Sequence, residues 1–352
     1  MRAYAVKVFC EPVEELDFPD PAPKGTEVVL AVTRCGVCHS DLHLQEGFYE
    51  LGGGKRMSLA DRGVTPPVVL GHEVYGTLVA KGPDAPIADD QIGKSFIAFP
   101  WLGCGQCEIC LSGQENLCAK PNAVGVHRYG GQAEKLLLPH SRYLVEAEGV
   151  DPSLAATYAC SGLTAYSALK KVSIDRAKDW LLILGLGGVG LSGLQIARAL
   201  GFRNIAVADI DDSKRALATR HGAGVVVDPK EPGALEALAQ ATGGIGAAID
   251  FVGARPTAEF GMAALKKAGT YIIVGLFGGD TQLSLPLLVL RALTLRGSYV
   301  GNLAELRELI DLVKAGKVEP LPTETVPMTA VNDALERLRA GKVNGRLVLA
   351  RG

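Results

Sequence analysis

Four cysteines lie close together near residue 110. Cys104, Cys107, Cys110 and Cys118 have the spacing C-x2-C-x2-C-x7-C. Four thiolates on one short segment are the ligand set of a closed tetrahedral zinc site, which stabilises irregular backbone that has little hydrophobic core of its own. Because four protein ligands leave no position for a substrate, we predict a structural zinc ion here and no chemistry.

Two other functions of this cysteine segment agree less well with its sequence. Iron–sulfur motifs also begin with C-x2-C-x2-C, but a fourth cysteine and a proline then follow after three residues. Here seven residues intervene and Ala119 comes next. A zinc module that binds nucleic acid usually carries basic residues, whereas this segment has Glu108, Glu115 and no arginine. We therefore predict no nucleic-acid partner.

A second set of residues suited to metal chemistry is scattered along the sequence. Its members are Cys38, Ser40, Asp41, His43, His72, Glu73 and Cys160. Two cysteines and one histidine are a known ligand set for catalytic zinc, with the fourth position left to water or substrate. Each also has a simpler interpretation: Cys160 as a small buried residue, His72 as a turn histidine, and Cys35-x2-Cys38 as a redox pair. The spacing alone leaves open whether the ligands converge.

A glycine motif in the second half of the chain predicts dinucleotide binding. Residues 181–184 are an apolar run typical of a buried parallel strand, and Gly185, Gly187 and Gly190 follow at G-x-G-x-x-G spacing. A helical pattern and a second strand come next. The glycines would allow a tight turn, approach of a pyrophosphate, and close packing of helix on strand, and the helix N terminus would bind the phosphates.

The acidic residue that ends the second strand indicates NAD. Asp209 lies nineteen residues after Gly190, where a carboxylate accepts hydrogen bonds from the adenosine ribose and would repel the 2′-phosphate of NADP. Lys214 and Arg215 follow closely, so binding of NADP is disfavoured rather than excluded. The predicted cofactor-binding residues also include three that lie within or near this unit: Gly188, Val189 and Lys214.

The elements around these motifs predict two domains in an α/β fold. With 352 residues the chain is long for a single core. Residues 1–152 contain short apolar segments divided by turn residues, which is typical of an antiparallel β-rich domain. From residue 153, helical and strand patterns alternate and predict a six-stranded, doubly wound parallel sheet of the Rossmann type. Its strands are expected at 181–184, 204–209, 224–228, 247–252, 270–275 and 293–296.

Further elements follow from the same patterns. In the first domain we expect strands at 27–33, 74–80 and 94–99; after the parallel sheet we expect helices at 302–315 and 330–340 and a last strand at 345–350. Residues 45–67 are the longest stretch without a clear pattern. Long loops are usually functional or mobile, and this one follows Cys38–His43, so we predict a role in a substrate pocket or an interface.

Composition restricts the class of protein. The formal net charge is −2 and 48% of the residues are hydrophobic, which argues against a polyanion-binding or disordered protein. No apolar run has the length of a membrane span, and the chain does not begin with a signal-peptide pattern. We therefore expect a cytoplasmic protein with no membrane partner, whose eight cysteines serve metal binding or catalysis rather than disulfides.

Taken together and in this order, the motifs resemble those of zinc-dependent alcohol dehydrogenases of the medium-chain dehydrogenase/reductase (MDR) superfamily. They are CGVCHSDLH at 35–43, LGHE at 70–73, the four-cysteine segment, ACSGLTAY at 159–166 and GLGGVG at 185–190. The likeness extends over nearly the whole chain. It implies a GroES-like catalytic domain at residues 1–152, completed by 299–352, and a Rossmann NAD-binding domain at 153–298.

The resemblance also implies how the scattered set is used. Cys38, His72 and Cys160 would bind a catalytic zinc ion. Glu73 would lie behind the metal, and Asp41 would orient His72. Together with the four-cysteine site, this implies two zinc ions per chain.

Other residues receive roles by the same resemblance. Ser40 would take the substrate proton and pass it, through the nicotinamide ribose, to His43 and solvent. Thr164 would lie beside the nicotinamide, and Arg346 would reach the pyrophosphate. The residues implied to line the substrate pocket are Phe48, Trp101 and Tyr299.

The implied reaction is the reversible oxidation of primary or secondary alcohols to aldehydes or ketones by hydride transfer to NAD+. The nearest alternative is a polyol or other specialised dehydrogenase of the superfamily, but polyol enzymes commonly have glutamate in place of Cys160. A zinc-free quinone reductase-like protein and a noncatalytic zinc- and nucleotide-binding module are further alternatives, and neither requires this ligand set. The chain lacks the longer loops of the dimeric, animal-type enzymes, which implies a homotetramer.

Overall fold

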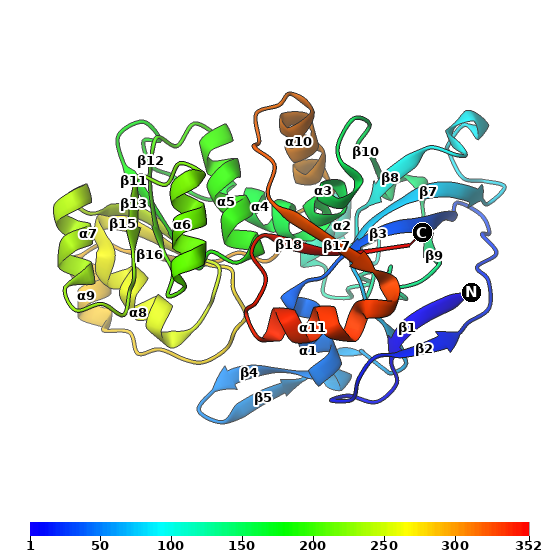
Figure 1. Cartoon of the computed structure of the whole chain (residues 1–352), viewed down its shortest axis with the longest axis horizontal. Helices are drawn as coiled ribbons and strands as arrows, with labels where there is room; N and C mark the ends of the chain where they lie inside the picture. The colour runs from blue at the N-terminus through cyan, green and yellow to red at the C-terminus, as the bar shows by residue number, and fades with distance from the viewer. Residues whose placement is uncertain (352) are drawn as a thin grey trace.

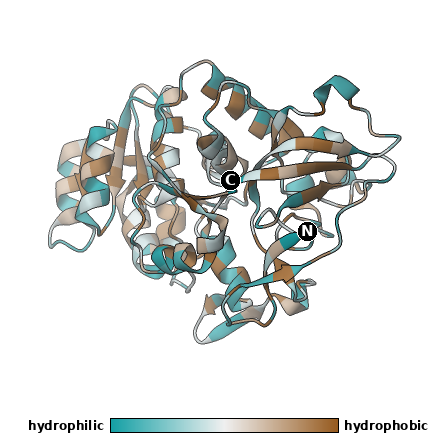
Figure 2. Cartoon of the chain, turned by 45° about the vertical axis from the view of Figure 1, so that its right-hand side comes forward, coloured by the Kyte–Doolittle hydropathy of each residue, from teal (hydrophilic) through white to brown (hydrophobic). Residues whose placement is uncertain are grey.

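Two large β-sheets with helices packed around them form the molecule (Figure 1). The structure, a computed structural model, describes residues 1–351. Within that range, no helix has both the length and the apolar character needed to cross a membrane. Hydrophobic residues run along the strands of both sheets (Figure 2), where they form the cores.

The second half of the chain folds around the predicted six-stranded parallel sheet. Its strands pair in the order β13-β12-β11-β14-β15-β16, which is the doubly wound order with β11 and β14 at the centre. The strands are β11 (Trp180–Leu184), β12 (Asn204–Ala208), β13 (Val225–Val227), β14 (Ile245–Asp250), β15 (Leu265–Ile273) and β16 (Thr294–Gly297). The predicted Rossmann topology is confirmed.

Helices cover both faces of this sheet, because alternate residues of each strand point to opposite sides. Leu181 and Ile183 pack on one face in the same core as Leu191 of α5, whereas Leu182 packs on the other face with Phe260 of α8. The helices are α5 (Gly188–Ala199), α6 (Asp212–Arg220), α7 (Ala234–Thr242), α8 (Arg255–Ala264) and α9 (Leu285–Leu290). This explains the continuous apolar run of β11.

The other large sheet has seven strands and is antiparallel except where β17 and β18 pair, as its sequence pattern predicted. The order is β10-β8-β7-β3-β18-β17, and β9 pairs with β3. The strands are β3 (Val28–Gly36), β7 (Glu73–Lys81), β8 (Ser95–Ala98), β9 (Lys135–Leu138), β10 (Leu144–Glu146), β17 (Thr323–Pro327) and β18 (Arg346–Ala350). The last strand of the chain therefore lies beside β3, with Val348 opposite Gly36.

Smaller elements connect and cover these sheets. A three-stranded sheet contains β1 (Arg2–Val6), β2 (Glu14–Asp17) and β6 (Val68–Val69). The helices outside the parallel sheet are α1 (His39–Glu46), α2 (Glu108–Leu111), α3 (Pro152–Thr157), the π-helix η5 (Tyr158–Gly162), α4 (Leu163–Lys170), α10 (Leu303–Lys314) and α11 (Val331–Arg339). The short 3-10 helices are η1 (Ala60–Arg62), η2 (Asp89–Gln91), η3 (Glu115–Leu117), η4 (Ser141–Tyr143) and η6 (Met328–Ala330). The helices expected at 302–315 and 330–340 are thus confirmed as α10 and α11.

The expectation of an irregular loop over residues 45–67 is wrong. Residues 48–58 form a β-hairpin of β4 (Phe48–Gly52) and β5 (Lys55–Ser58), and η1 follows it. Gly52, Gly53 and Gly54 have φ of +88°, +58° and +76°, so the turn uses the left-handed conformations that glycine adopts without strain. The turn lies against the parallel-sheet half of the chain, since a Cβ atom on Gly52 would be 2.6 Å from the backbone nitrogen of Asp280.

Candidate active site

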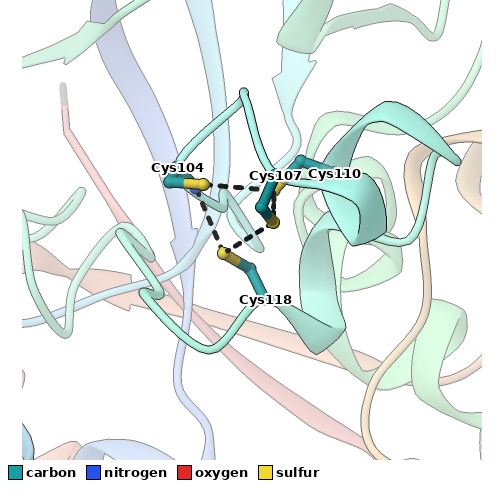
Figure 3. Close-up of side chains that lie close together, drawn as sticks. All are labelled: Cys104, Cys107, Cys110 and Cys118. Carbon is teal, nitrogen blue, oxygen red and sulfur yellow. Dashed lines mark hydrogen bonds between the residues drawn. The ribbon is translucent and has the colours of Figure 1, made fainter.

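The four clustered cysteines converge on one point (Figure 3). Their Sγ atoms are 3.8 Å apart for Cys104–Cys110, 3.5 Å for Cys107–Cys110 and 3.7 Å for Cys107–Cys118. A tetrahedron of sulfur atoms around zinc, with zinc–sulfur bonds of about 2.3 Å, requires separations of about 3.8 Å. The residues present therefore fit a structural zinc ion.

The thiols of this cluster differ in their environment: burial raises the pKa of Cys110 to about 12, whereas Cys104 is set up as a thiolate. Backbone N–H groups of Gln106 and Cys107 lower the pKa of Cys104 to about 6, which favours the thiolate that binds zinc. Nearby, Glu115 accepts a hydrogen bond from Arg142 Nη2 at 2.8 Å and from the hydroxyl of Tyr143 at 2.7 Å. These contacts hold the cysteine segment against η4.

Cys38, His72 and Cys160 are brought together although 122 residues separate the two cysteines. Cys38 precedes α1, His72 precedes β7, and Cys160 lies in η5. All three are buried, and the two Sγ atoms are 4.0 Å apart. Both ring nitrogens of His72 are buried without a hydrogen-bond partner within residues 1–351. Such a group is costly unless it has a ligand, so the three residues fit a metal ion with an open fourth position.

The thiol pair is set up to provide a thiolate. A hydrogen bond with Cys160 holds the pKa of Cys38 well below its usual value, and His72 acts in the same direction against the effect of burial. A metal-binding thiolate is therefore favoured at Cys38, one of the expected ligands of the catalytic zinc.

Asp41 holds this site in shape from the first turn of α1. Its Oδ2 accepts a hydrogen bond from the backbone nitrogen of Cys38 at 3.0 Å, and its Oδ1 accepts one from Gly71 at 3.2 Å. The same Oδ1 is 3.5 Å from Nδ1 of His72. Asp41 is thus placed to orient the imidazole, as in other histidine–metal sites.

Behind the ligands, Glu73 forms a buried ion pair with Arg346. Its Oε1 also accepts a hydrogen bond from the backbone of Ser161 at 3.1 Å, one residue after Cys160. Burial raises the pKa of Glu73 to about 7, although Arg346 opposes this shift. Glu73 therefore links the strand that follows His72 to the π-helix that carries Cys160.

Arg346 connects this pair to the glycine motif. Its Nη2 donates to Glu73 and to the carbonyl oxygen of Val37, whereas Nη1 would lie 2.8 Å from a Cβ atom placed on Gly188. Since Gly188 begins α5, the guanidinium is located between the metal-ligand set and the helix end expected to bind pyrophosphate.

The glycines of the motif perform separate tasks. Gly185 has φ of +84° at the turn, and a Cβ atom on Gly190 would be only 1.8 Å from the carbonyl oxygen of Gly185. In contrast, no atom lies within 4 Å of a Cβ atom placed on Gly187. This open space lies at the first turn of α5, where Gly188, Val189 and Gly190 have backbone N–H groups without helical partners.

Two other predicted cofactor residues, Asp209 and Lys214, lie at the same edge of the sheet. Asp209 follows β12, and its carboxylate accepts hydrogen bonds from the backbone of Leu186 at 2.6 Å and of Asp211 at 2.9 Å. Lys214 lies in the first turn of α6. Thr164 lies in α4, and its hydroxyl is buried without a partner in the part of the chain that the structure describes.

Ser40 and His43 lie on α1 beside the buried thiols. Ser40 Oγ is 3.9 Å from Cys38 Sγ, and the ring of His43 is 4.8 Å from that of Tyr49. Burial lowers the pKa of His43, which keeps the imidazole neutral and able to accept a proton at neutral pH. The two residues are thus arranged between the metal-ligand set and the hairpin.

Two of the three expected pocket residues lie near the metal-ligand set. The ring of Trp101 is 5.3 Å from His72 and 6.2 Å from Tyr299. The ring of Phe48 packs 3.9 Å beneath the guanidinium of Arg56 on the hairpin. Side chains of neighbouring strand residues point to opposite faces, so Tyr49 is the residue that faces His43.

Tyr49 and His39 were missed by the sequence analysis. Tyr49 lies in a stretch without pattern, so only the strand pairing shows which way it points. His39 begins α1, and partial desolvation together with the positive charges of Arg346 and Lys214 lowers its pKa. Its position directly after Cys38 was the available signal. His39 therefore lies near Arg346 and Lys214, two of the residues expected to contact the cofactor.

Comparisons with known proteins agree with this arrangement. Residues 24–148 match the family described as alcohol dehydrogenase GroES-like domain, and residues 188–315 match zinc-binding dehydrogenase. The chain is 34% identical over 351 residues to the NAD-dependent alcohol dehydrogenase of Sulfurisphaera tokodaii, covering 99% of both chains. It is also 34% identical to an alcohol dehydrogenase of Geobacillus stearothermophilus, over 99% of this chain and 98% of that protein.

A solved structure gives the same result for the fold. The alcohol dehydrogenase of the archaeon Aeropyrum pernix superimposes with a TM-score of 0.89 at 28% identity, over 100% of both chains. The fold and the two cysteine-based sites are those of a zinc-binding dehydrogenase. The chain belongs to the zinc-type alcohol dehydrogenase family of the MDR superfamily.

Proposed function

We propose that this protein oxidises primary or secondary alcohols reversibly to aldehydes or ketones, with NAD+ as the hydride acceptor. The observation that carries this proposal is the buried Cys38–His72–Cys160 set, joined through Glu73 and Arg346 to the start of α5. For hydride transfer, the alcohol bound at the metal site and the nicotinamide ring must lie next to each other. This connection provides that proximity.

Each part of the site has a task in the reaction. When bound, zinc supplies a Lewis acid that lowers the pKa of the alcohol, and NAD+ supplies the hydride acceptor. Ser40 lies close enough to Cys38 to accept the alcohol proton, and neutral His43 receives it and releases it to solvent. Trp101, Tyr299 and Tyr49 provide apolar walls that limit water around the reacting atoms.

The cofactor is NAD rather than NADP in this proposal. Asp209 presents a carboxylate at the end of β12, where it is suited to the ribose hydroxyls and would repel a 2′-phosphate. Lys214 and His39 contribute positive or hydrogen-bonding groups on the phosphate side, and Thr164 offers its unpartnered hydroxyl near the nicotinamide.

We assign the two tasks to two domains. Residues 1–152 and 299–352 would form the catalytic domain, because β17 and β18 complete the seven-stranded sheet with β3. Residues 153–298 would bind NAD, because the complete six-stranded parallel sheet lies within them. The ligands of the catalytic metal then come mainly from the first domain, with Cys160 just beyond its boundary.

A homotetramer in the cytoplasm is the remaining part of the proposal. The helix α9 and the loop before it carry apolar side chains that are exposed in the single chain: Phe277 (69%), Leu285 (69%), Leu290 (70%) and Val289 (77%). Exposed apolar patches of this kind are typical of subunit interfaces. None of the eight cysteines within residues 1–351 forms a disulfide, which suits a reducing compartment.

A spectrophotometric alcohol panel tests the proposed activity. Primary, secondary and aromatic alcohols are supplied with NAD+ or NADP+, and reduced cofactor is followed by its absorbance. We expect turnover of at least one alcohol class with NAD+ and a much lower kcat/KM with NADP+. If the metal-loaded protein oxidises only polyols, the substrate class is wrong; if it oxidises no alcohol, the proposed reaction is wrong.

A further inference from the structure

Asn116 lies in the four-cysteine segment and contacts a residue far from it in the sequence. Its Nδ2 donates a hydrogen bond to the carbonyl oxygen of Tyr299 at 3.2 Å, although 183 positions separate the two residues. Tyr299 lies between β16 and α10, where the parallel-sheet half of the chain ends. The contact therefore joins the predicted structural zinc segment to a residue expected to line the substrate pocket.

The donor of this hydrogen bond is held in place by its neighbours. Asn116 lies in η3, directly after Glu115 and two residues before Cys118. Glu115 is buried and accepts hydrogen bonds from Arg142 and from the hydroxyl of Tyr143. Because a carbonyl oxygen accepts only from the NH2 group of Asn116, the amide orientation is fixed, and its Oδ1 is left buried without a partner within residues 1–351.

The acceptor lies in a stretch of backbone with few contacts of its own. Within residues 1–351, the Asn116 amide makes the one hydrogen bond that reaches the backbone of residues 299–301. On the other side, a Cβ atom placed on Gly301 would be 2.5 Å from Cδ1 of Leu163, the first residue of α4. Residues 299–301 are thus held between the four-cysteine segment and α4.

The same stretch has a conformation that needs support. Val300 has φ of +37°, in the left-handed region that β-branched residues rarely adopt. Such a conformation costs free energy and persists only where the surrounding structure holds it. The carbonyl group of Tyr299 belongs to the peptide bond that precedes Val300, so the hydrogen bond from Asn116 fixes the peptide plane on which this φ depends.

The position of the Tyr299 ring depends on this backbone. The neighbouring ring, that of Trp101 at 6.2 Å, is 4% exposed and donates from Nε1 to the carbonyl oxygen of Ala159 at 3.2 Å. Tyr299, in contrast, is 52% exposed in the single chain. Trp101 is therefore fixed by contacts of its own side chain, whereas Tyr299 is fixed mainly through its backbone.

We propose that Asn116 is a positioning residue for the substrate pocket. It holds the peptide between Tyr299 and Val300, and thereby keeps the Tyr299 ring at a set distance from Trp101 and the metal-ligand set. The four-cysteine segment then fixes one wall of the pocket and contributes to the discrimination between large and small alcohols. The effect on substrates rests on the proposed function, whereas the positioning of residues 299–301 does not.

Steady-state kinetics with benzyl alcohol and ethanol test this role in the full-length, metal-loaded protein at saturating NAD+. In Asn116→Ala we expect the KM for benzyl alcohol to rise about three- to tenfold, the effect of losing one hydrogen bond. Because the Tyr299 ring faces the body of a large alcohol rather than the reacting atoms, kcat and both constants for ethanol should change less than about twofold.

A second variant separates the hydrogen bond from the volume of the side chain. Asn116→Asp keeps the size of the side chain and lacks the donor, so it should raise the KM for benzyl alcohol at least as much. An effect in Asn116→Ala alone would overturn the proposal. Zinc is counted in each variant, and loss of zinc from both variants would also overturn it, because Asn116 would then act through the metal site.

Two comparisons show whether the effect passes through Tyr299. Ser112→Ala removes a hydrogen bond of 2.9 Å to the carbonyl oxygen of Ile109 inside the same four-cysteine segment, and its kinetics should equal those of the wild type. In a Tyr299→Ala background, Asn116→Ala should change the KM for benzyl alcohol less than about twofold. An equal rise in both backgrounds means that Asn116 acts elsewhere and contradicts the proposal.

Hydrogen exchange measures the positioning without any substrate. We expect the amides of residues 299–301 to exchange faster in Asn116→Ala than in the wild type or in Ser112→Ala, since the stretch loses its hydrogen bond. Unchanged exchange there overturns the proposal. If the wild type oxidises no alcohol, the proposed function fails, and this measurement still decides whether Asn116 holds the segment.

Discussion

Glu73 and Arg346 form the contact on which both halves of the site depend. Glu73 contacts the helix of Cys160 through Ser161, and Arg346 lies against the first residue of α5. Both side chains are buried, so each charge depends on the other for compensation. At the scale of single residues, this pair is the physical link between metal binding and cofactor binding.

Removing Arg346 should therefore be costly. We expect Arg346→Met to lower the free energy of unfolding by about 3–5 kcal/mol, because it leaves Glu73 buried without a partner. Denaturant unfolding of the metal-loaded protein measures this change. The matched control is Glu73→Gln/Arg346→Met, which should recover part of the loss; a double variant less stable than Arg346→Met would contradict the argument.

The neutral state of His43 leads to a prediction about proton transfer at neutral pH. Burial lowers the pKa of His43 in the folded protein, so protonation is disfavoured and the acceptor form is lost only when the pH falls below its ordinary pKa of about 6.5. His43→Gln should lower kcat by about 10²-fold at neutral pH, the effect of losing one proton-transfer group. The KM for NAD+ should stay unchanged, and an unaltered kcat would exclude His43 from proton transfer.

At the scale of elements, two glycines where β11 leads into α5 have different functions, and substituting each one separates those functions. Gly190→Ala places a methyl group against the carbonyl oxygen of Gly185, and we expect a loss of about 1–3 kcal/mol in unfolding free energy from overpacking. Gly187→Ala places it in open space, and the change in stability should stay within about 0.5 kcal/mol.

Both substitutions should nevertheless weaken NADH binding, as measured by fluorescence titration. In Gly187→Ala the methyl group occupies the space through which the pyrophosphate approaches the helix. Undiminished NADH affinity in Gly187→Ala would mean that the cofactor does not bind at this turn.

Elements with strong periodicity could be predicted from the sequence, and those that depend on pairing could not. The parallel strands are recognisable as short continuous apolar runs, and α10 because its apolar residues repeat at the period of a helix. The β4–β5 hairpin has no such pattern: Tyr49 and Met57 become partners only through the glycine turn. For that reason the contact of Tyr49 with His43 was beyond sequence analysis.

At the scale of the whole molecule, the two metal sites differ in how far apart their ligands lie in the sequence. The four-cysteine site is predictable because its ligands lie within fifteen residues of sequence. Residue types and spacing alone left the convergence of Cys38, His72 and Cys160 open, and the resemblance to known dehydrogenases indicated it. Physically, the convergence requires the β3–β7 pairing and the packing of η5 behind Glu73.

The central claim is that this fold creates a second, catalytic metal site beside the NAD-binding turn. The most direct measurement determines zinc per chain, together with NAD+-dependent alcohol oxidation, in the wild type and in Cys160→Ala. We predict two zinc ions and turnover in the wild type, and one zinc ion without turnover in the variant. One zinc ion in an active wild type, or full activity in Cys160→Ala, would contradict the account.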